Sequence, residues 1–220
     1  HGSGGTTTVL IDTSPDMRDQ LLAADVNHVD AVFYTHAHAD HLHGIDDLRA
    51  FWMKTRRLVE VYADETTAGR ILDAFRYCFE SPRGSSYPPI LRLNRITAYE
   101  PVRIDGAGGV IELLPYRQAH GTIHTLGFKV GGLSYSCDVS GLEPDAQSVI
   151  EGSDVWLVDA LRHEPHPSHF SVSETLGWIE RLGVKRGLLT HMDYSLDYET
   201  LRRALPPNVE PAHDGMVIEL

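Results

Sequence analysis

Residues 36 to 41 read His-Ala-His-Ala-Asp-His and follow directly on a strand-like apolar run. Imidazole nitrogens bind ions such as zinc, iron or manganese, and a carboxylate shifts a site toward harder ions. Alternate side chains of an extended segment share a face, so His36 and His38 can bind one ion. Asp40 and His41 fall where the chain would turn into a helix, from which they can reach a second ion. The alternative is a polar surface loop that is merely rich in histidine.

Three further polar residues stand at the ends of strand-like runs, and each is a potential ligand. They are His120 after Gln118-Ala119, Asp138 after Cys137, and His191 after Thr190. Ligands on strand ends are held rigidly, as a site for two ions requires. A solvated loop is the alternative for His120 and His191, and a helix or turn cap is the alternative for Asp138.

The surrounding pattern predicts a mixed α/β domain in which short strands alternate with a few helices. Gly131-Gly132 is expected to be the two-residue turn of a hairpin, and residues 81–89 are expected to form a loop. The helix at 171–183 carries a capping box, Ser171 with Glu174. Predicted strands are 7–12, 31–35, 59–63, 110–115, 125–130, 133–138, 155–159, 187–190 and 216–220, and the other predicted helices are 66–79 and 197–205.

Composition places the chain among ordinary soluble globular proteins. Its 220 residues fit one domain, residues 1–220, with 42% hydrophobic and 23% charged residues. No run approaches the roughly 20 apolar residues that span a bilayer. Two cysteines make no disulfide framework, so a cytoplasmic location is expected. Residues 1–5 resemble a linker, a tag remnant or the end of a disordered loop. The abrupt start of the predicted strand 7–12 suggests that an upstream strand is missing from this sequence.

The formal net charge of −12 argues against a large nucleic-acid interface, which needs a basic face. It does not exclude a small anionic substrate, because bound metal ions would supply local positive charge. The charge therefore favours a small anionic partner, with no nucleic-acid polymer and no membrane.

The motif at 36–41, followed in order by His120, Asp138 and His191, resembles the ligand set of the metallo-β-lactamase superfamily. The resemblance spans nearly the whole chain and implies an αββα four-layer sandwich with two divalent ions, zinc or manganese. It implies that His36, His38 and His120 hold the first ion. Asp40, His41 and His191 would hold the second, Asp138 would bridge the two, and Asp12 would support the ligand loop or cap a turn.

Within the superfamily, residues 35–49 closely resemble the PhnP-like cyclic-phosphate phosphodiesterases. The stretch 166–169 matches the place where those enzymes carry an extra active-site histidine. We therefore expect His169 to be the general acid, with Asp40 as a further catalytic candidate; the alternative for His169 is a helix cap. Strand alternation should point Cys137 away from Asp138 and into the core. His43, His124, His163 and His166 are expected at the surface, and His213 is not expected to be a ligand.

The resemblance thus implies a binuclear metal-dependent phosphodiesterase in which a metal-bridging hydroxide attacks a small phosphate diester; a ribosyl cyclic phosphate, a cyclic nucleotide and other small diesters are the candidates. The expected partner is therefore a small phosphate ester, and the resemblance is compatible with a homodimer. Three alternatives stay open. A tRNA 3′-processing endonuclease would carry the same centre, although it usually needs a basic surface. A thioester or lactone hydrolase would use the same nucleophile on a carbonyl carbon. A non-catalytic metal-binding protein could retain the fold.

Overall fold

A computed structural model describes residues 4–220 of the chain, which form two compact units, one up to residue 112 and one from residue 113 onward. Of the expected N-terminal linker, residues 1–3 lie outside the described part. Whether the whole chain acts as the expected single domain stays a prediction.

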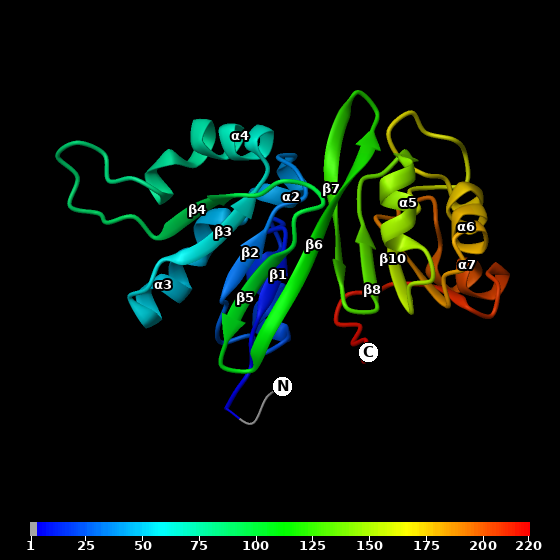
Figure 1. Cartoon of the computed structure of the whole chain (residues 1–220), viewed down its shortest axis with the longest axis horizontal. Helices are drawn as coiled ribbons and strands as arrows, with labels where there is room; N and C mark the ends of the chain where they lie inside the picture. Colours follow the sequence, from blue (N-terminus) through cyan, green and yellow to red (C-terminus); the bar gives the residue numbers. More distant parts are fainter. Residues whose placement is uncertain (1–3) are drawn as a thin grey trace. The chain divides into compact units, whose positions relative to one another are not determined.

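The first unit is built on a parallel sheet of four strands in the order β1-β2-β3-β4 (Figure 1). One face of the sheet, which includes Val32, Tyr34 and Val61, is fully buried and packs with Ile71 of helix α4 in one apolar core. The strands are β1 (Val9–Ile11), β2 (Ala31–Phe33), β3 (Val59–Ala63) and β4 (Leu91–Arg95). The helices are α1 (Met17–Ala23), α2 (Ala39–Leu42), α3 (Arg49–Thr55) and α4 (Glu65–Phe75), with 3₁₀ turns at Ile45–Leu48 and Arg76–Cys78.

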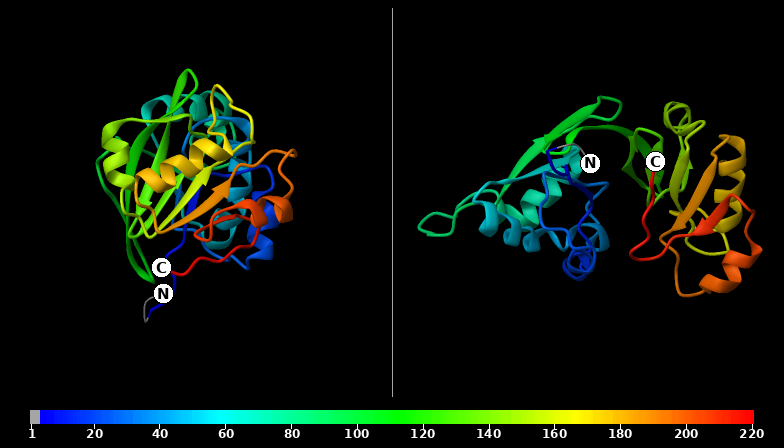
Figure 2. Two further views of the ribbon diagram at one scale, coloured as in Figure 1. Left: turned by 90° about the vertical axis from the view of Figure 1, so that its right-hand side faces the viewer. Right: turned by 90° about the horizontal axis from the view of Figure 1, so that it is seen from below.

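The second unit contains a mixed sheet in the order β12-β11-β10-β8-β7-β6, with β9 also paired to β6. Strand β5 (Val102–Gly106) follows β6 at the sheet edge, and it belongs to the first unit, as do the first residues of β6. Figure 2 shows α5 and α6 on the same face of this sheet. The strands are β6 (Gly109–His120), β7 (Ile123–Val130), β8 (Leu133–Ser136), β9 (Gly141–Leu142), β10 (Val155–Asp159), β11 (Arg186–Thr190) and β12 (Val209–Pro211), and the helices are α5 (Pro144–Ile150), α6 (Val172–Arg181) and α7 (Tyr198–Ala204).

Most predicted elements are present. Strands β3 and β10 have the predicted bounds, and the β7–β8 hairpin turns at Gly131 and Gly132 as expected. Helix α6 carries the predicted capping box, in which Ser171 and Glu174 bond each other's backbone N–H groups. The longest described helix, α4, has 11 residues, and no described helix has the length and apolarity needed to cross a bilayer.

The predicted strand at 216–220 is wrong, because this segment has no regular secondary structure. The apolar residues Met216-Val217-Ile218 give this segment a strand propensity, but a strand also needs a neighbour to pair with. The position beside β11 is taken by β12, whose Val209 pairs with Gly187. The same dependence on pairing explains why the short strands β4, β5, β9 and β12 were not predicted.

Candidate functional site

In the first unit, the 36–41 motif begins in the loop after β2 and runs into the short helix α2, which contains Asp40 and His41. His36 and His41 are buried, whereas His38 and Asp40 are exposed. The ring of His36 lies 4.4 Å from the ring of His38 and 4.4 Å from that of His41. His36 and His38 each offer a ring nitrogen, and the two nitrogens lie within 4.8 Å of one another. The loop therefore gathers the imidazoles as the spacing predicted.

The carboxylate of Asp12 holds this segment in place by accepting three hydrogen bonds from it. Its Oδ1 accepts a hydrogen bond from the Thr35 backbone N–H at 2.8 Å, and its Oδ2 accepts from Thr35 Oγ1 at 2.8 Å and His41 Nδ1 at 2.7 Å. Because the Thr35 hydroxyl gives its proton to Asp12, its oxygen accepts from His36 Nδ1 at 3.0 Å. These bonds fix the tautomer with the proton on Nδ1, so His36 and His41 present an Nε2 lone pair for a metal. The predicted supporting role of Asp12 is present in the structure.

Backbone hydrogen bonds and a close contact at Gly44 fix the position of Asp12 beside the ligand loop. Asp12 adopts φ 63°, a left-handed conformation that is uncommon outside glycine, directly after β1. Its N–H bonds Phe33 O at 2.8 Å, and the next N–H, of Thr13, bonds His41 O at 2.7 Å. A side chain at Gly44 would meet Ser14 O at 2.2 Å, so only glycine permits this close approach. The carboxylate and the ligand loop are thus clamped together.

In the second unit, the buried carboxylate of Asp138 stands between two of the predicted ligands. Its Oδ1 lies 3.1 Å from His191 Nε2, and its Oδ2 lies 3.4 Å from His120 Nε2. His120 Nδ1 donates to Ser168 O at 2.6 Å, which again leaves Nε2 as the metal-facing nitrogen. Each carboxylate oxygen therefore faces a different imidazole, as a bridging ligand requires. The donors present in both units are of the kinds that bind zinc or manganese.

Cys137 is buried as predicted, but the expectation that it points away from Asp138 is wrong. Its Sγ donates a hydrogen bond to Asp138 Oδ1 at 3.4 Å. Asp138 has φ 52°, so the extended conformation ends before it and strand alternation no longer applies. Cys137 and His191 each offer a ligand atom within 4.8 Å of the Asp138 carboxylate. The Cys137 thiol therefore lies directly beside the Asp138 carboxylate.

His169 lies among the predicted ligands of the second unit although it is far from them in sequence. Its ring stands 4.7 Å from that of His120 and stacks at 4.9 Å on that of His191. The alternative role as a helix cap is wrong, because Ser171 caps α6. The segment is fixed by a hydrogen bond from Phe170 N to Val139 O at 2.7 Å.

Asp159 is a site residue that the sequence analysis missed. It is fully buried at the end of β10, and its Oδ2 accepts from His169 Nδ1 at 2.7 Å and from Val139 N at 3.0 Å. Burial raises the pKa of Asp159, and the hydrogen bond and positive charge of His169 oppose that rise. Asp159, His169 and His191 offer ligand atoms within 4.8 Å of one another. The rule applied to the other strand ends would have found this aspartate.

The remaining histidines follow the surface prediction with one exception. His43, His124, His163 and His213 are exposed. His166 is only partly exposed, and its ring lies 5.1 Å from that of His169. Burial, together with the positive charge of His169, lowers the pKa of His166. His166 therefore borders the site.

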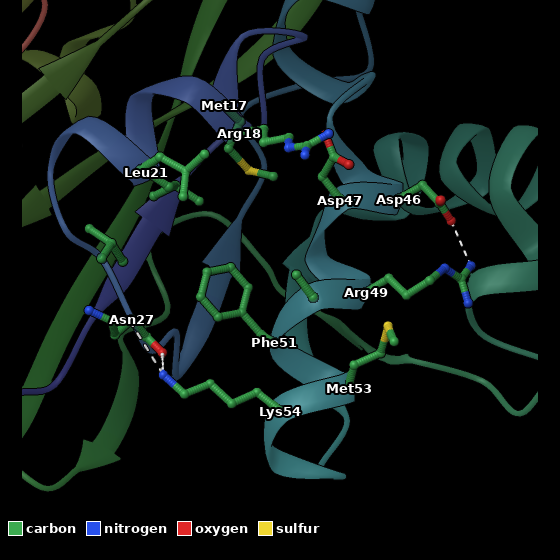
Figure 3. Close-up of a pocket in the computed structure, with 13 residues that line it drawn as sticks. Met17, Arg18, Leu21, Asn27, Asp46, Asp47, Arg49, Phe51, Met53 and Lys54 are labelled. Atoms are coloured by element: carbon green, nitrogen blue, oxygen red, sulfur yellow. Dashed lines mark hydrogen bonds and ion pairs between the residues drawn. The ribbon is translucent and has the colours of Figure 1, made fainter.

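A separate cavity of about 510 Å³ lies in the first unit between α1 and α3 (Figure 3). Its wall is mainly apolar, with Met17, Leu21 and Phe51, while Lys54 bonds Asn27 and Arg49 pairs with Asp46 at its rim. None of the predicted ligands lines it. The cavity therefore has no part in the candidate metal chemistry.

Comparison with known proteins identifies the family. Residues 7–192 match the family model described as the beta-lactamase superfamily domain. The chain belongs to the β-lactamase superfamily. The predicted α/β class and metallo-β-lactamase fold are confirmed.

Two relatives are each 32% identical to this chain over the aligned residues. A crystal structure described as a new diphosphatase from the PhnP family is 32% identical, with a TM-score of 0.84, over 94% of this chain and 77% of that one. A protein of Porphyromonas gingivalis named octanoyltransferase is 32% identical over 94% of this chain. The chain spans only 41% of the length of that protein.

More distant structures share the fold alone. Zinc-bound PqqB from Methylobacterium extorquens is 17% identical with a TM-score of 0.75, over 96% of this chain and 83% of that one. The short form of human tRNase Z is 18% identical with a TM-score of 0.71, over 96% of this chain and 87% of that one.

Proposed function

We propose that the chain hydrolyses a small phosphate diester at a centre of two divalent ions. His36, His38 and His120 would hold one ion, Asp40, His41 and His191 the other, and Asp138 both. The Nδ1 hydrogen bonds of His36, His41 and His120 support these assignments, because each leaves Nε2 for the metal. The 32% identity to a PhnP-family diphosphatase supports chemistry at phosphorus.

The observation that carries the proposal is the position of His169 among two proposed ligands, His120 and His191. A metal site alone would need no such residue. An imidazole held at Nδ1 by a buried carboxylate presents Nε2 as a proton donor, and the carboxylate stabilises the charged ring. Hydrolysis of a diester needs such a donor, because the departing alkoxide is a poor leaving group until it is protonated.

The roles of the residues follow from this arrangement. When bound, the two ions would neutralise the phosphate oxygens and lower the pKa of a water nucleophile. His169 would give its Nε2 proton to the leaving oxygen, and Asp159 would orient the ring and stabilise its charge. Asp12 would hold His41, and through Thr35 also His36, in the productive orientation. The product would be a phosphomonoester and an alcohol.

The proposed substrate is a small molecule in the cytoplasm rather than a nucleic-acid polymer. A net charge of −12 opposes a long polyanion, whose binding depends on many basic contacts. The ions would balance only the local charge of one phosphate group.

The test is hydrolysis of bis(p-nitrophenyl) phosphate by protein loaded with zinc or manganese, with Asp138→Ala as the control. We expect turnover that needs the metal and is lost in the variant. Ions bound without any turnover on phosphate esters would contradict the proposal and favour a carbonyl substrate or a non-catalytic role.

A second candidate is hydrolysis of a diphosphate, which the PhnP-family diphosphatase favours. Attack at phosphorus and the same ligands would serve either bond. The two differ at the leaving group, because a departing phosphate needs less help from an acid than an alkoxide does. Activity on an organic diphosphate that survives His169→Ala would favour this candidate.

The alternative of thioester or lactone hydrolysis is favoured by one observation, the similarity to the relative named octanoyltransferase. Hydrolysis of an octanoyl thioester, compared with that of the diester under the same metal loading, tests it directly.

A further inference from the structure

A cavity of about 380 Å³ in the second unit shares a wall with His191. Its apolar wall residues include Leu157 of β10, Met192 beside His191, and Met216 and Ile218 of the C-terminal segment, and polar groups line nearly as much of it. His213 and Asp214, both exposed, add two polar groups to its rim. The cavity adjoins His191, a proposed metal ligand, and the proposed function makes no use of it.

The C-terminal segment turns away from the sheet after β12 and forms part of the cavity wall. Strand β12 pairs with β11, and Ala212 N bonds Leu189 O at 2.8 Å. A turn then follows, closed by a hydrogen bond from Met216 N to His213 O at 3.0 Å, with Gly215 at φ 80°. The turn returns Met216 and Ile218 to the cavity wall instead of continuing the sheet.

We infer that this cavity binds an aromatic or heteroaromatic ring of the substrate, attached to the phosphoryl group that reacts beside His191. Two thioethers, of Met192 and Met216, line one small space, and methionine sulfur makes favourable contacts with ring edges. Flexible methionine side chains also adapt to a flat group that enters and leaves. Polar atoms at the rim can bond ring substituents.

The inference rests on the proposed function only for the reaction at phosphorus. The cavity is lined by residues of the second unit alone, so ring binding can be measured directly.

The chain offers a direct probe, because it has only four methionines. Met192 and Met216 line this cavity, whereas Met17 and Met53 line the separate cavity of the first unit and serve as internal controls. The zinc-loaded protein, labelled with carbon-13 on its methionine methyl groups, is titrated with phenylphosphonate, methylphosphonate and hexylphosphonate. Individual Met→Leu variants assign the four signals.

We expect phenylphosphonate to shift the signals of Met192 and Met216 and to leave those of Met17 and Met53 in place. Methylphosphonate should cause little change at any methionine. Equal shifts with hexylphosphonate would overturn the aromatic class. Shifts at Met17 and Met53, or no shift at all, would overturn the binding site.

A kinetic comparison tests the role of the cavity in selectivity. Bis(p-nitrophenyl) phosphate and methyl p-nitrophenyl phosphate release the same leaving group and differ in the group that is retained. Ala212→Phe fills the cavity and should lower the preference for the aryl diester about tenfold, mainly through KM. Val217→Phe is the matched control, because Val217 is 82% exposed and lies outside the cavity wall.

An unchanged preference in Ala212→Phe, or an equal loss in Val217→Phe, would overturn the role in selectivity. If Ala212→Phe does not fold, the titration of the unaltered protein still decides ring binding. Absence of hydrolysis with either diester would refute the proposed function, whereas absence of methionine shifts would refute the ring site.

Discussion

The candidate ligands fall into two halves, one in each unit, and these halves are built in different ways. In the first unit, four potential ligands lie within six residues, and one carboxylate, Asp12, fixes the loop that carries them. In the second unit, His120, Asp138, Asp159 and His191 come from the ends of four strands, and His169 comes from the segment before α6. The first half depends on local conformation and the second on the order of strands in a sheet.

Both halves nevertheless share one backbone feature at their strand ends. Asp12, Asp138 and His191 all adopt left-handed backbone conformations, with φ of 63°, 52° and 58°. Such conformations are costly outside glycine and persist where surrounding contacts impose them. In the second unit this conformation places Asp138 beside Cys137, against the alternation of a regular strand. The left-handed backbone conformation of the residue that ends a strand therefore sets the direction of that residue's side chain.

The largest effect is expected from Asp138→Ala, in the half assembled from distant segments. The change removes the carboxylate that faces both His120 and His191. We expect metal-dependent hydrolysis to fall by about 10³-fold or more, together with loss of at least one ion per chain. Kinetics and elemental analysis of the dialysed protein measure the two effects. Full activity with an unchanged metal content would remove Asp138 from the centre.

A smaller loss, about 10²- to 10³-fold in kcat on a diester that releases an alkoxide, is expected from His169→Ala. The ion content should stay the same, because His169 would act on the leaving group. Asp159→Asn should reproduce part of this loss, since it weakens the acceptor of His169 Nδ1. His163→Ala, at an exposed histidine, is the control. Loss of metal in His169→Ala would show that this imidazole is a ligand instead.

Asp12→Asn tests the half built by one loop. The amide cannot accept all the hydrogen bonds that Thr35 and His41 give to the carboxylate. Metal affinity should fall by about 10- to 100-fold, with activity largely recovered at high metal concentration. Competition with a chelating dye measures the affinity. Asp30→Asn, which changes an acid that bonds Thr8 N outside the ligand loop, should leave metal affinity unaltered.

The smallest effect is expected at Asp197, outside both halves. Hydrogen bonds from Thr200 hold the pKa of this N-cap carboxyl below its usual value of 3.8. A lowered pKa in the folded state means that the charge stabilises α7 above pH 3.8, and that this stabilisation is lost as the pH falls through the folded pKa. Asp197→Asn should lower Tm by roughly 1–2 °C near neutral pH, with a gap that closes in acid.

Thermal unfolding at several pH values measures this gap. Glu164→Gln, at an exposed carboxyl outside the helices, is the control. A gap that widens in acid would mean that the carboxyl is not stabilised in its charged form.

The sequence predicted the parts of the site that depend on local patterning. The motif at 36–41, the strand-end positions of His120, Asp138 and His191, and the capping box at Ser171 all follow from short spacings. The same strand-end rule would have selected Asp159, but only the structure shows that its partner is His169. The direction of Cys137 was mispredicted because alternation assumes an unbroken strand.

The sequence by itself determined the family, the ligand types and the loop of the first unit, since residue type, short spacing and local backbone preference suffice for these. Only the tertiary structure decided which distant residues meet. It placed His169 on His191, gave Asp159 its partner, and turned the segment after β12 away from the sheet to leave a cavity beside His191. These outcomes depend on strand order and on competition for pairing partners, which no local pattern encodes.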